Sequence, residues 1–276
     1  MAKPLAGREF IEKGRQVLAE MYGEDHPIKV KYFAFQSLQE SIEEKIDALK
    51  LISEESFAFA ENLNGPGESL FMLEVYHERV SVMSETGEVT RESIKETMAK
   101  MEAICTKLGL VSHYLAQVKT LLALNTFNKN ALELAEVDFE HPLERKRKIA
   151  EEPIAILEEC LVDTMRQVSI KDLPKDLSWY TMNEVPLAIR THPFLDRTLF
   201  QLGRKNIFVG DFVKAQSFLD QLIMSREHTY GEGSFNLIKP IETIAQVFRL
   251  QNQPDQCQVI IKQCLDIISD LLGEER

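Results

Sequence analysis

The stretch THPFLDRTLFQLGRKNIFVGDFVKAQSFLDQLI, residues 191–223, combines the apolar periodicity of two helices with small residues at defined places. Two antiparallel helices pack closely only where one of them carries almost no side chain. Gly203 is therefore predicted at the crossing point of the first helix, opposite Ala215 in the second. Gly210, followed by Asp211, is predicted to form the turn, because glycine adopts positive φ without steric cost. The core between the two helices is expected to contain Leu199, Leu202, Phe212, Leu219 and Leu222.

The rest of the 276-residue chain shows the same helical period. Residues Ile94, Met98, Met101 and Cys105, for example, fall on one stripe. Alternating runs and Asn-Gly turns, which would indicate strands, are nearly absent. The sequence predicts an all-α fold of about 10–12 helices, each of about 12–20 residues.

A junction motif recurs along the chain. YGEDHP at 22–27 resembles YGEGSF at 230–235, with weaker copies at 65–70, 109–114 and 190–195. The aligned residues are His26, Ser69, Ser112, His192 and Ser234, with gaps of 43, 43, 80 and 42 residues. The gap of 80 is close to two periods, so a degraded junction is expected near Glu152-Pro153. A period near 42 that holds two helices predicts a helical solenoid.

Residues 196–223 resemble a tetratricopeptide repeat, with Leu202-Gly203 at positions seven and eight, Gly210 at fifteen and Ala215 at twenty. The copy that starts at Ile238 fits the same pattern. The period and the junction resemble the extended repeats of kinesin light chains. In earlier copies Glu92 stands at the small-residue position and Asn130 at the turn glycine. The resemblance implies a right-handed α-solenoid, with degenerate repeats over 1–170, an irregular linker loop over 171–186, and well-matched repeats with a terminal helix over 187–276.

The resemblance also implies a binding groove, because the first helix of each repeat lines the concave surface. The corresponding residues of the best copy are Arg197, Phe200, Arg204, Ile207 and Phe208. Two arginines above an apolar floor suit an acidic peptide with an apolar anchor. Pairing of both arginines with neighbouring glutamates is the alternative interpretation.

Two further sites are candidates for secondary partner contacts. The basic run Arg145, Lys146, Arg147 and Lys148 could contact an acidic surface such as a tubulin tail, or form a solvated helix face. Trp179 lies between two prolines in the linker and is either a partner anchor or an aromatic packed back onto the solenoid.

No catalytic residue, cofactor site or metal site is expected. The four cysteines show no CxxC spacing, and Cys257 and Cys264 fall on small-residue positions of a helix, where free cysteine packs as a small apolar residue. His26, His141 and His192 each precede proline and are interpreted as helix starts.

The net charge of −12 argues against nucleic-acid binding, and no apolar run is long enough for membrane insertion. A cytoplasmic protein in a reducing compartment is expected. The preferred hypothesis is a non-catalytic interaction scaffold, a structural subunit of a cytoskeletal or ciliary (axonemal) assembly with tubulin-associated partners. The alternatives are a soluble cargo adaptor of kinesin-light-chain type and the helical module of a SET/MYND-type methyltransferase. The last is disfavoured because these residues contain no zinc-binding cysteine cluster and no SET portion.

Overall fold

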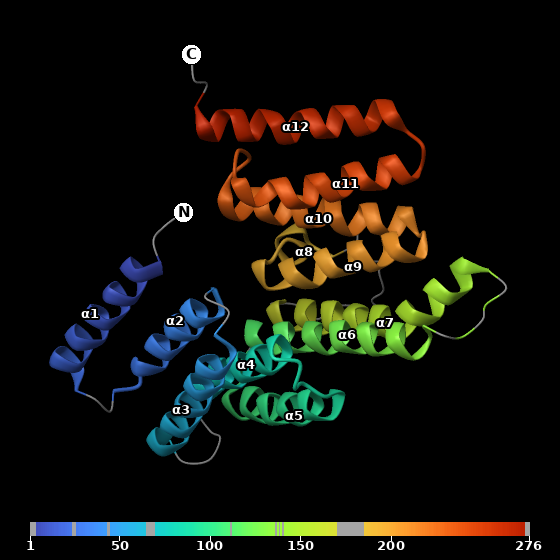
Figure 1. Ribbon diagram of the computed structural model, residues 1–276. Helices are drawn as coiled ribbons and strands as arrows, with labels where there is room; N and C mark the ends of the chain where they lie inside the picture. Colours follow the sequence, from blue (N-terminus) through green and yellow to red (C-terminus); the bar gives the residue numbers. More distant parts are fainter. Residues whose placement is uncertain are drawn as a thin grey trace. The chain divides into compact units, whose positions relative to one another are not determined.

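The computed structural model describes residues 4–23, 26–42, 45–64, 70–110, 112–135, 137, 139, 141–169 and 185–273. These residues form twelve α-helices and two short 3-10 helices, and none of them lies in a β-strand (Figure 1). The predicted all-α fold is confirmed. The chain divides into two units, Met1–Leu121 and Leu122–Arg276, and this division falls inside a helix. Residues 171–184 of the predicted linker lie outside the described residues. The separation into degenerate and well-matched repeats stays a prediction.

The first unit is a series of helices, of which the first four each pack on the next one in sequence. Its helices are α1 (Pro4–Tyr22), α2 (Lys29–Ile42), α3 (Ile46–Asn64), α4 (Leu70–Glu85), α5 (Arg91–Leu108) and the first half of α6 (His113–Glu133). Met72, Ile94 and Met101 are completely buried in its core. The apolar stripe predicted for α5 therefore faces inward. Gly87 forms the turn between α4 and α5 with a φ of +74°.

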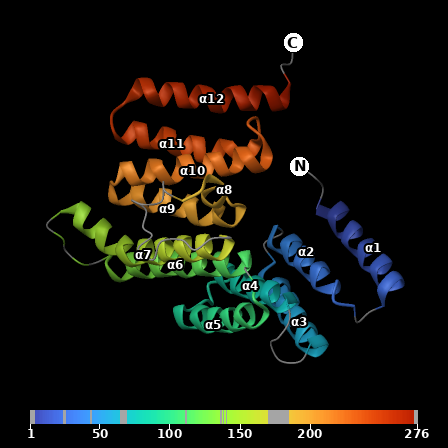
Figure 2. The ribbon, with the colours of Figure 1, turned by 180° about the vertical axis from the view of Figure 1, so that it is seen from behind.

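The second unit continues with the rest of α6 and the helices that follow it. They are α7 (Pro142–Val168), α8 (Leu187–Arg190), the 3-10 helix η2 (Pro193–Leu195), α9 (Asp196–Val209), α10 (Phe212–Tyr230), the 3-10 helix η3 (Phe235–Leu237), α11 (Ile238–Leu250) and α12 (Pro254–Leu272). The pairs α9–α10 and α11–α12 lie side by side in both ribbon views (Figures 1 and 2).

The crossing point of α9 and α10 depends on Gly203, but its neighbour is not the predicted one. A Cβ atom added to Gly203 would lie 2.7 Å from Cγ of Leu219, which is closer than real carbon atoms approach. The nearest side chain is thus Leu219, one turn beyond Ala215. The notch left by glycine admits a leucine side chain, while Ala215 is itself completely buried.

The turn between these helices forms as expected. Gly210 ends α9 in the left-handed conformation, with a φ of +81°. The Asp211 carboxylate begins α10 by accepting a hydrogen bond of 3.1 Å from the backbone amide of Lys214. The expected core residues Leu199, Leu202, Leu219 and Leu222 are all completely buried, and Phe212 packs against them.

Three of the repeat junctions share one local structure. Nδ1 of His26 and Nδ1 of His192 each accept a hydrogen bond from the backbone amide two residues later, at 3.2 and 3.3 Å. The hydroxyl of Ser234 accepts the equivalent bond at 3.2 Å. This explains why histidine and serine alternate at the aligned positions: both place an acceptor within reach of the next turn. Ser69 lies outside the described residues, and the buried hydroxyl of Ser112 forms no such bond with a described residue.

The junction expected near Glu152-Pro153 does not exist. Pro153 is buried inside α7, which runs without interruption from Pro142 to Val168. Proline has no N–H, so the carbonyl of Ile149 loses its helical partner. The Asn130 side-chain amide donates to this carbonyl at 3.2 Å. Asn130 therefore lies within α6 and not in a turn, and a neighbouring helix supplies the bond that proline cannot make.

Candidate functional site

The five predicted groove residues lie on one face of α9. Because successive residues of a helix are rotated by about 100°, these five occupy roughly 100° of its circumference. Phe200 and Ile207 are half-buried and pack against the core of the second unit. The Phe208 ring meets the Phe127 ring of α6 edge to face, with centroids 5.1 Å apart. The three apolar residues of the predicted groove are therefore packed against their neighbours and form the floor of the site.

Arg197 is half-buried on this face. Burial lowers the pKa of its guanidinium, because removing a charge from water disfavours the charged form. Among the described residues, no side chain forms an ion pair or hydrogen bond with it. The predicted alternative, pairing with a neighbouring glutamate, is not what the structure shows for Arg197.

Arg204 lies seven residues, or two helical turns, further along α9 and is exposed. Its guanidinium carbon is 5.9 Å from the centroid of the Phe200 ring, within the range of a cation–π interaction. It too lacks an ion-pair partner in the part of the chain that the structure describes. Its charge is thus held above the apolar floor and available to an anion.

Lys205 belongs to the same site, although the repeat positions omit it. Its Nζ atom lies 3.2 Å from the centroid of the Phe127 ring. Burial, together with the positive charge of Arg204, lowers the pKa of Lys205 to about 8. Only the approach of α6 to α9 reveals this role, because the sequence shows no more than a lysine beside an arginine.

The basic run of α7 divides among different roles. Lys146 extends toward α9, with Nζ 5.6 Å from the centroid of the Phe208 ring. Arg145 instead donates a hydrogen bond of 3.0 Å to the carbonyl of Ala135, and Lys148 forms an ion pair of 3.8 Å with Glu151. Of the run, Lys146 contacts a ring of the α9 site, whereas Arg147 lies beside Val209 at the end of α9. Trp179 lies outside the described residues.

We call this site the basic face. It consists of the cations Lys146, Arg197, Arg204 and Lys205 and the rings of Phe127, Phe200 and Phe208. None of the four cations forms an ion pair or hydrogen bond with a described side chain, in a protein of net charge −12. Several cations elsewhere are paired, as in Lys31 with Glu74 at 2.6 Å.

A buried polar group lies within the basic face. Gln201 is on the same side of α9, between Arg197 and Lys205, and only 9% of its surface is exposed. Its side-chain carbonyl oxygen Oε1 is buried and has no hydrogen-bond partner among the described residues. Such an acceptor is costly to leave unmatched.

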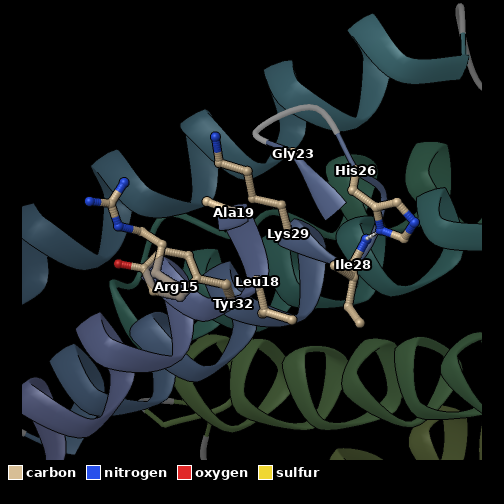
Figure 3. A pocket seen from close by; sticks show the side chains of 8 residues that line it. All are labelled: Arg15, Leu18, Ala19, Gly23, His26, Ile28, Lys29 and Tyr32. Carbon is tan, nitrogen blue, oxygen red and sulfur yellow. Dashed lines mark hydrogen bonds between the residues drawn. The ribbon is translucent and has the colours of Figure 1, made fainter. Parts of the chain in front are cut away.

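A small cavity lies between α1 and α2. It is lined by residues that include Arg15, Leu18 and Tyr32. His26 and Ile28, which are joined by a hydrogen bond, also line it (Figure 3). Its volume is about 20 Å³, which is room for one water molecule. This cavity is too small for an organic ligand.

The described residues show no group of three or more histidine, cysteine or acidic side chains placed to hold a metal ion. The four cysteines are free, and Cys105, Cys160 and Cys264 are buried. No helix in the described ranges is long and apolar enough to cross a bilayer. That the chain has no metal, cofactor or catalytic activity stays a prediction.

Comparison with known proteins identifies the fold of this chain. No family model matches the sequence, and no curated protein matches it significantly. Among solved structures, BtubC (BKLC) from P. vanneervenii superposes with a TM-score of 0.60 and 13% identity, covering 99% of this chain and 92% of that one. TPR-like repeats of a protein described as a kinesin light chain from Podosopora anserina superpose with a TM-score of 0.52 and 14% identity, covering 90% and 99%. The chain therefore has the TPR-like solenoid fold that the resemblance implied.

Proposed function

We propose that this chain is a non-catalytic scaffold that binds an acidic segment of a partner protein on the basic face. The observation that supports this proposal is the set of four cations without anionic partners, two of which, Arg197 and Lys205, are half-buried. Removing a cation from water without a counter-charge is unfavourable, and a bound carboxylate offsets that cost.

The geometry also defines the kind of segment. Arg197 and Arg204 are seven residues apart, two turns of α9, and suit two carboxylates or one carboxylate flanked by polar groups. Phe200 and Ile207, at the edge of the same face, suit an apolar anchor between the acidic residues.

The proposal is tested with a fluorescein-labelled ten-residue peptide that carries aspartate and glutamate around a central leucine. Fluorescence anisotropy is expected to show binding that weakens with added salt, because the contacts are charge-assisted. Replacing Arg197 and Arg204 together by glutamate should weaken binding by about a hundredfold or more. Circular dichroism and thermal melting should change little.

The matched control reverses two exposed lysines away from this face, Lys239→Glu and Lys262→Glu, which changes the net charge equally. This variant should bind the peptide nearly as well as the parent chain. Equal weakening in both variants would mean that overall charge attracts the peptide, and the basic face would not be its docking site.

We further propose that the scaffold is cytoplasmic and fixed within a cytoskeletal or ciliary assembly. The unequal helix pairs favour individually shaped contacts, since α6 and α7 have 21 and 27 residues and α9 and α10 have 14 and 19. The similarity to a kinesin light chain favours the cargo adaptor instead. Stepwise salt extraction of native material separates the two: release at low salt fits an adaptor, and retention in the insoluble fraction fits a fixed subunit.

A further inference from the structure

A hollow of about 330 Å³ lies on the first unit, with walls from α2, α3, α4 and α6. Helix α3 packs against both α2 and α4, and α2 also contacts α4, so these helices hold its shape. The volume is at the lower end of the range for ligand pockets, which is room for one long side chain rather than for a large ligand. The residues that line it include Ser37, Leu49, Glu74, Glu78, Glu85 and Tyr114.

The hollow is negatively charged. Glu74, Glu78 and Glu85 of α4 contribute three carboxylates, and no lysine or arginine is among the described residues that line it. Glu74 is neutralised by Lys31, whose Nζ atom lies 2.6 Å from its carboxylate. Glu78 forms no ion pair with a described residue. Its charge therefore remains uncompensated inside the first unit.

The surroundings of Glu78 are unfavourable for a carboxylate. Its Oε1 atom accepts a hydrogen bond from the Ser37 hydroxyl, whereas Oε2 is buried and has no hydrogen-bond partner among the described residues. Burial raises the pKa of Glu78 despite the bond from Ser37, and the negative charge of Glu74 raises it further. A positive charge in the hollow would offset the cost of keeping this carboxylate ionised.

An aromatic ring forms the wall contributed by α6. The Tyr114 ring lies beside the His77 ring, with centroids 5.5 Å apart, and both residues line the hollow. Nζ of Lys31 donates a hydrogen bond of 3.4 Å to the Tyr114 hydroxyl, which fixes the ring at one end. Guanidinium is the cation that can stack its plane on a ring while it donates hydrogen bonds to a carboxylate. The ammonium group of lysine has no plane to stack.

We propose that this hollow binds an arginine side chain of a partner protein, with its guanidinium against the Tyr114 ring and beside the carboxylates of α4. Charge complementarity argues for a basic occupant, and the aromatic wall argues for guanidinium. An extended protein segment can present one long side chain to a surface hollow of this size. The site lies wholly within the first unit, so it is separate from the basic face and does not depend on the proposed function.

NMR spectroscopy of the ¹⁵N-labelled chain at pH 7 tests the proposal with a capped peptide of glycine and serine that carries one central arginine. The peptide should cause saturable shifts of backbone amides in α2 and α4. The same peptide with citrulline, a neutral isostere of arginine, should bind at least about tenfold more weakly, and the lysine peptide should bind more weakly than the arginine peptide. Equal binding of the citrulline or the lysine peptide would overturn the proposal. So would an arginine peptide that shifts no amide of the first unit at about 10 mM.

Three variants test the walls of the hollow. Glu78→Gln removes the charge but keeps the shape, and it should weaken binding of the arginine peptide by at least about tenfold. Tyr114→Leu removes the ring and should also weaken binding, whereas Tyr114→Phe keeps the ring and should bind like the parent.

The matched control is Glu54→Gln, which loses the same charge at an exposed position of α3. It should bind the arginine peptide like the parent, and circular dichroism should show every variant folded. Equal weakening in Glu78→Gln and Glu54→Gln would mean that overall charge attracts the peptide. That result would overturn the proposal, as would full binding by Glu78→Gln.

Discussion

The side-chain amide of Asn130 in α6 donates a hydrogen bond to the backbone carbonyl of Ile149 in α7, at 3.2 Å. That carbonyl lies four residues before Pro153, which has no N–H to offer it. A bond between helices thus replaces one that is missing within a helix. It lets α7 continue through a proline that would otherwise favour a break.

This relationship predicts that Asn130→Ala lowers the free energy of unfolding by about 1–3 kcal/mol, because the buried carbonyl loses its donor. Urea unfolding followed by circular dichroism measures the change. Pro153→Ala restores a backbone N–H to α7, so Asn130→Ala should cost less in that background. Strictly additive effects of the two substitutions would show that Asn130 does not compensate for the proline.

Gly203→Ala should lower the free energy of unfolding by about 1–3 kcal/mol, because the new Cβ atom would lie 2.7 Å from Cγ of Leu219, which is completely buried. Gly14→Ala is the matched control, since that position is open and alanine is favoured in helices by about 1 kcal/mol. Thermal melting at low concentration compares them. A Gly203→Ala variant as stable as the control would contradict the close approach of α9 and α10.

Lys205 should make stability depend on pH. Its pKa is about 8 in the folded protein and lies below its ordinary value of 10.5, so the unfolded chain binds more protons between these limits. The contribution of Lys205 to the free energy of unfolding should therefore rise from pH 8 to pH 10.5. Comparing the parent with Lys205→Met by urea unfolding across this window measures it. A constant difference would mean that Lys205 is fully hydrated.

The same group should control binding of the acidic peptide. Affinity is expected to fall as pH rises through about 8, because Lys205 then loses the charge that attracts the peptide. Lys205→Arg should retain affinity up to pH 9, since guanidinium stays protonated there. Anisotropy titrations at pH 7 and pH 9 measure both. Parallel losses in the two proteins would assign the pH effect to another group.

Arg226 should be important for the junction between the last two repeats. Its guanidinium binds both carboxylate oxygens of Asp196, at 2.6 and 2.7 Å, and donates to the carbonyl of Asn236 at 2.6 Å. Arg226→Lys cannot reproduce this planar arrangement and should lower the melting temperature, at a cost of about 1–2 kcal/mol. Lys239→Arg, at an exposed surface pair, is the control and should melt like the parent.

Much of the fold follows from local signals. Gly210 and Asp211 predict the turn between α9 and α10, because positive φ and an amide acceptor are properties of single residues. The alternation of histidine and serine at the junctions predicts the repeat phase for the same reason. Pro153 shows the limit of such signals. Judged from α7 alone, Pro153 predicts a break in the helix. The side chain that donates to the unpaired carbonyl, Asn130, belongs to another helix, α6.

The candidate site divides in a similar way. Arg197, Phe200, Arg204, Ile207 and Phe208 share a face because of helical geometry alone, so their register in the sequence was sufficient to group them. Lys205 was missed, since its low pKa and its ring contact arise from the approach of Phe127 on α6. Lys146, Arg145 and Lys148 look alike in the sequence. Only the structure shows that Lys146 contacts the Phe208 ring, whereas Arg145 binds the carbonyl of Ala135 and Lys148 pairs with Glu151.

The sequence by itself determined that helices pair at a period near 42 residues, where α9 ends and α10 begins, and that Leu199, Leu202, Leu219 and Leu222 are buried. Those properties depend on residues close together in the chain. Only the tertiary structure decided that Leu219 fills the notch of Gly203, that Asn130 supports Pro153, and that four cations gather without counter-charges. Each of these depends on the distance between separate helices, which no short segment specifies.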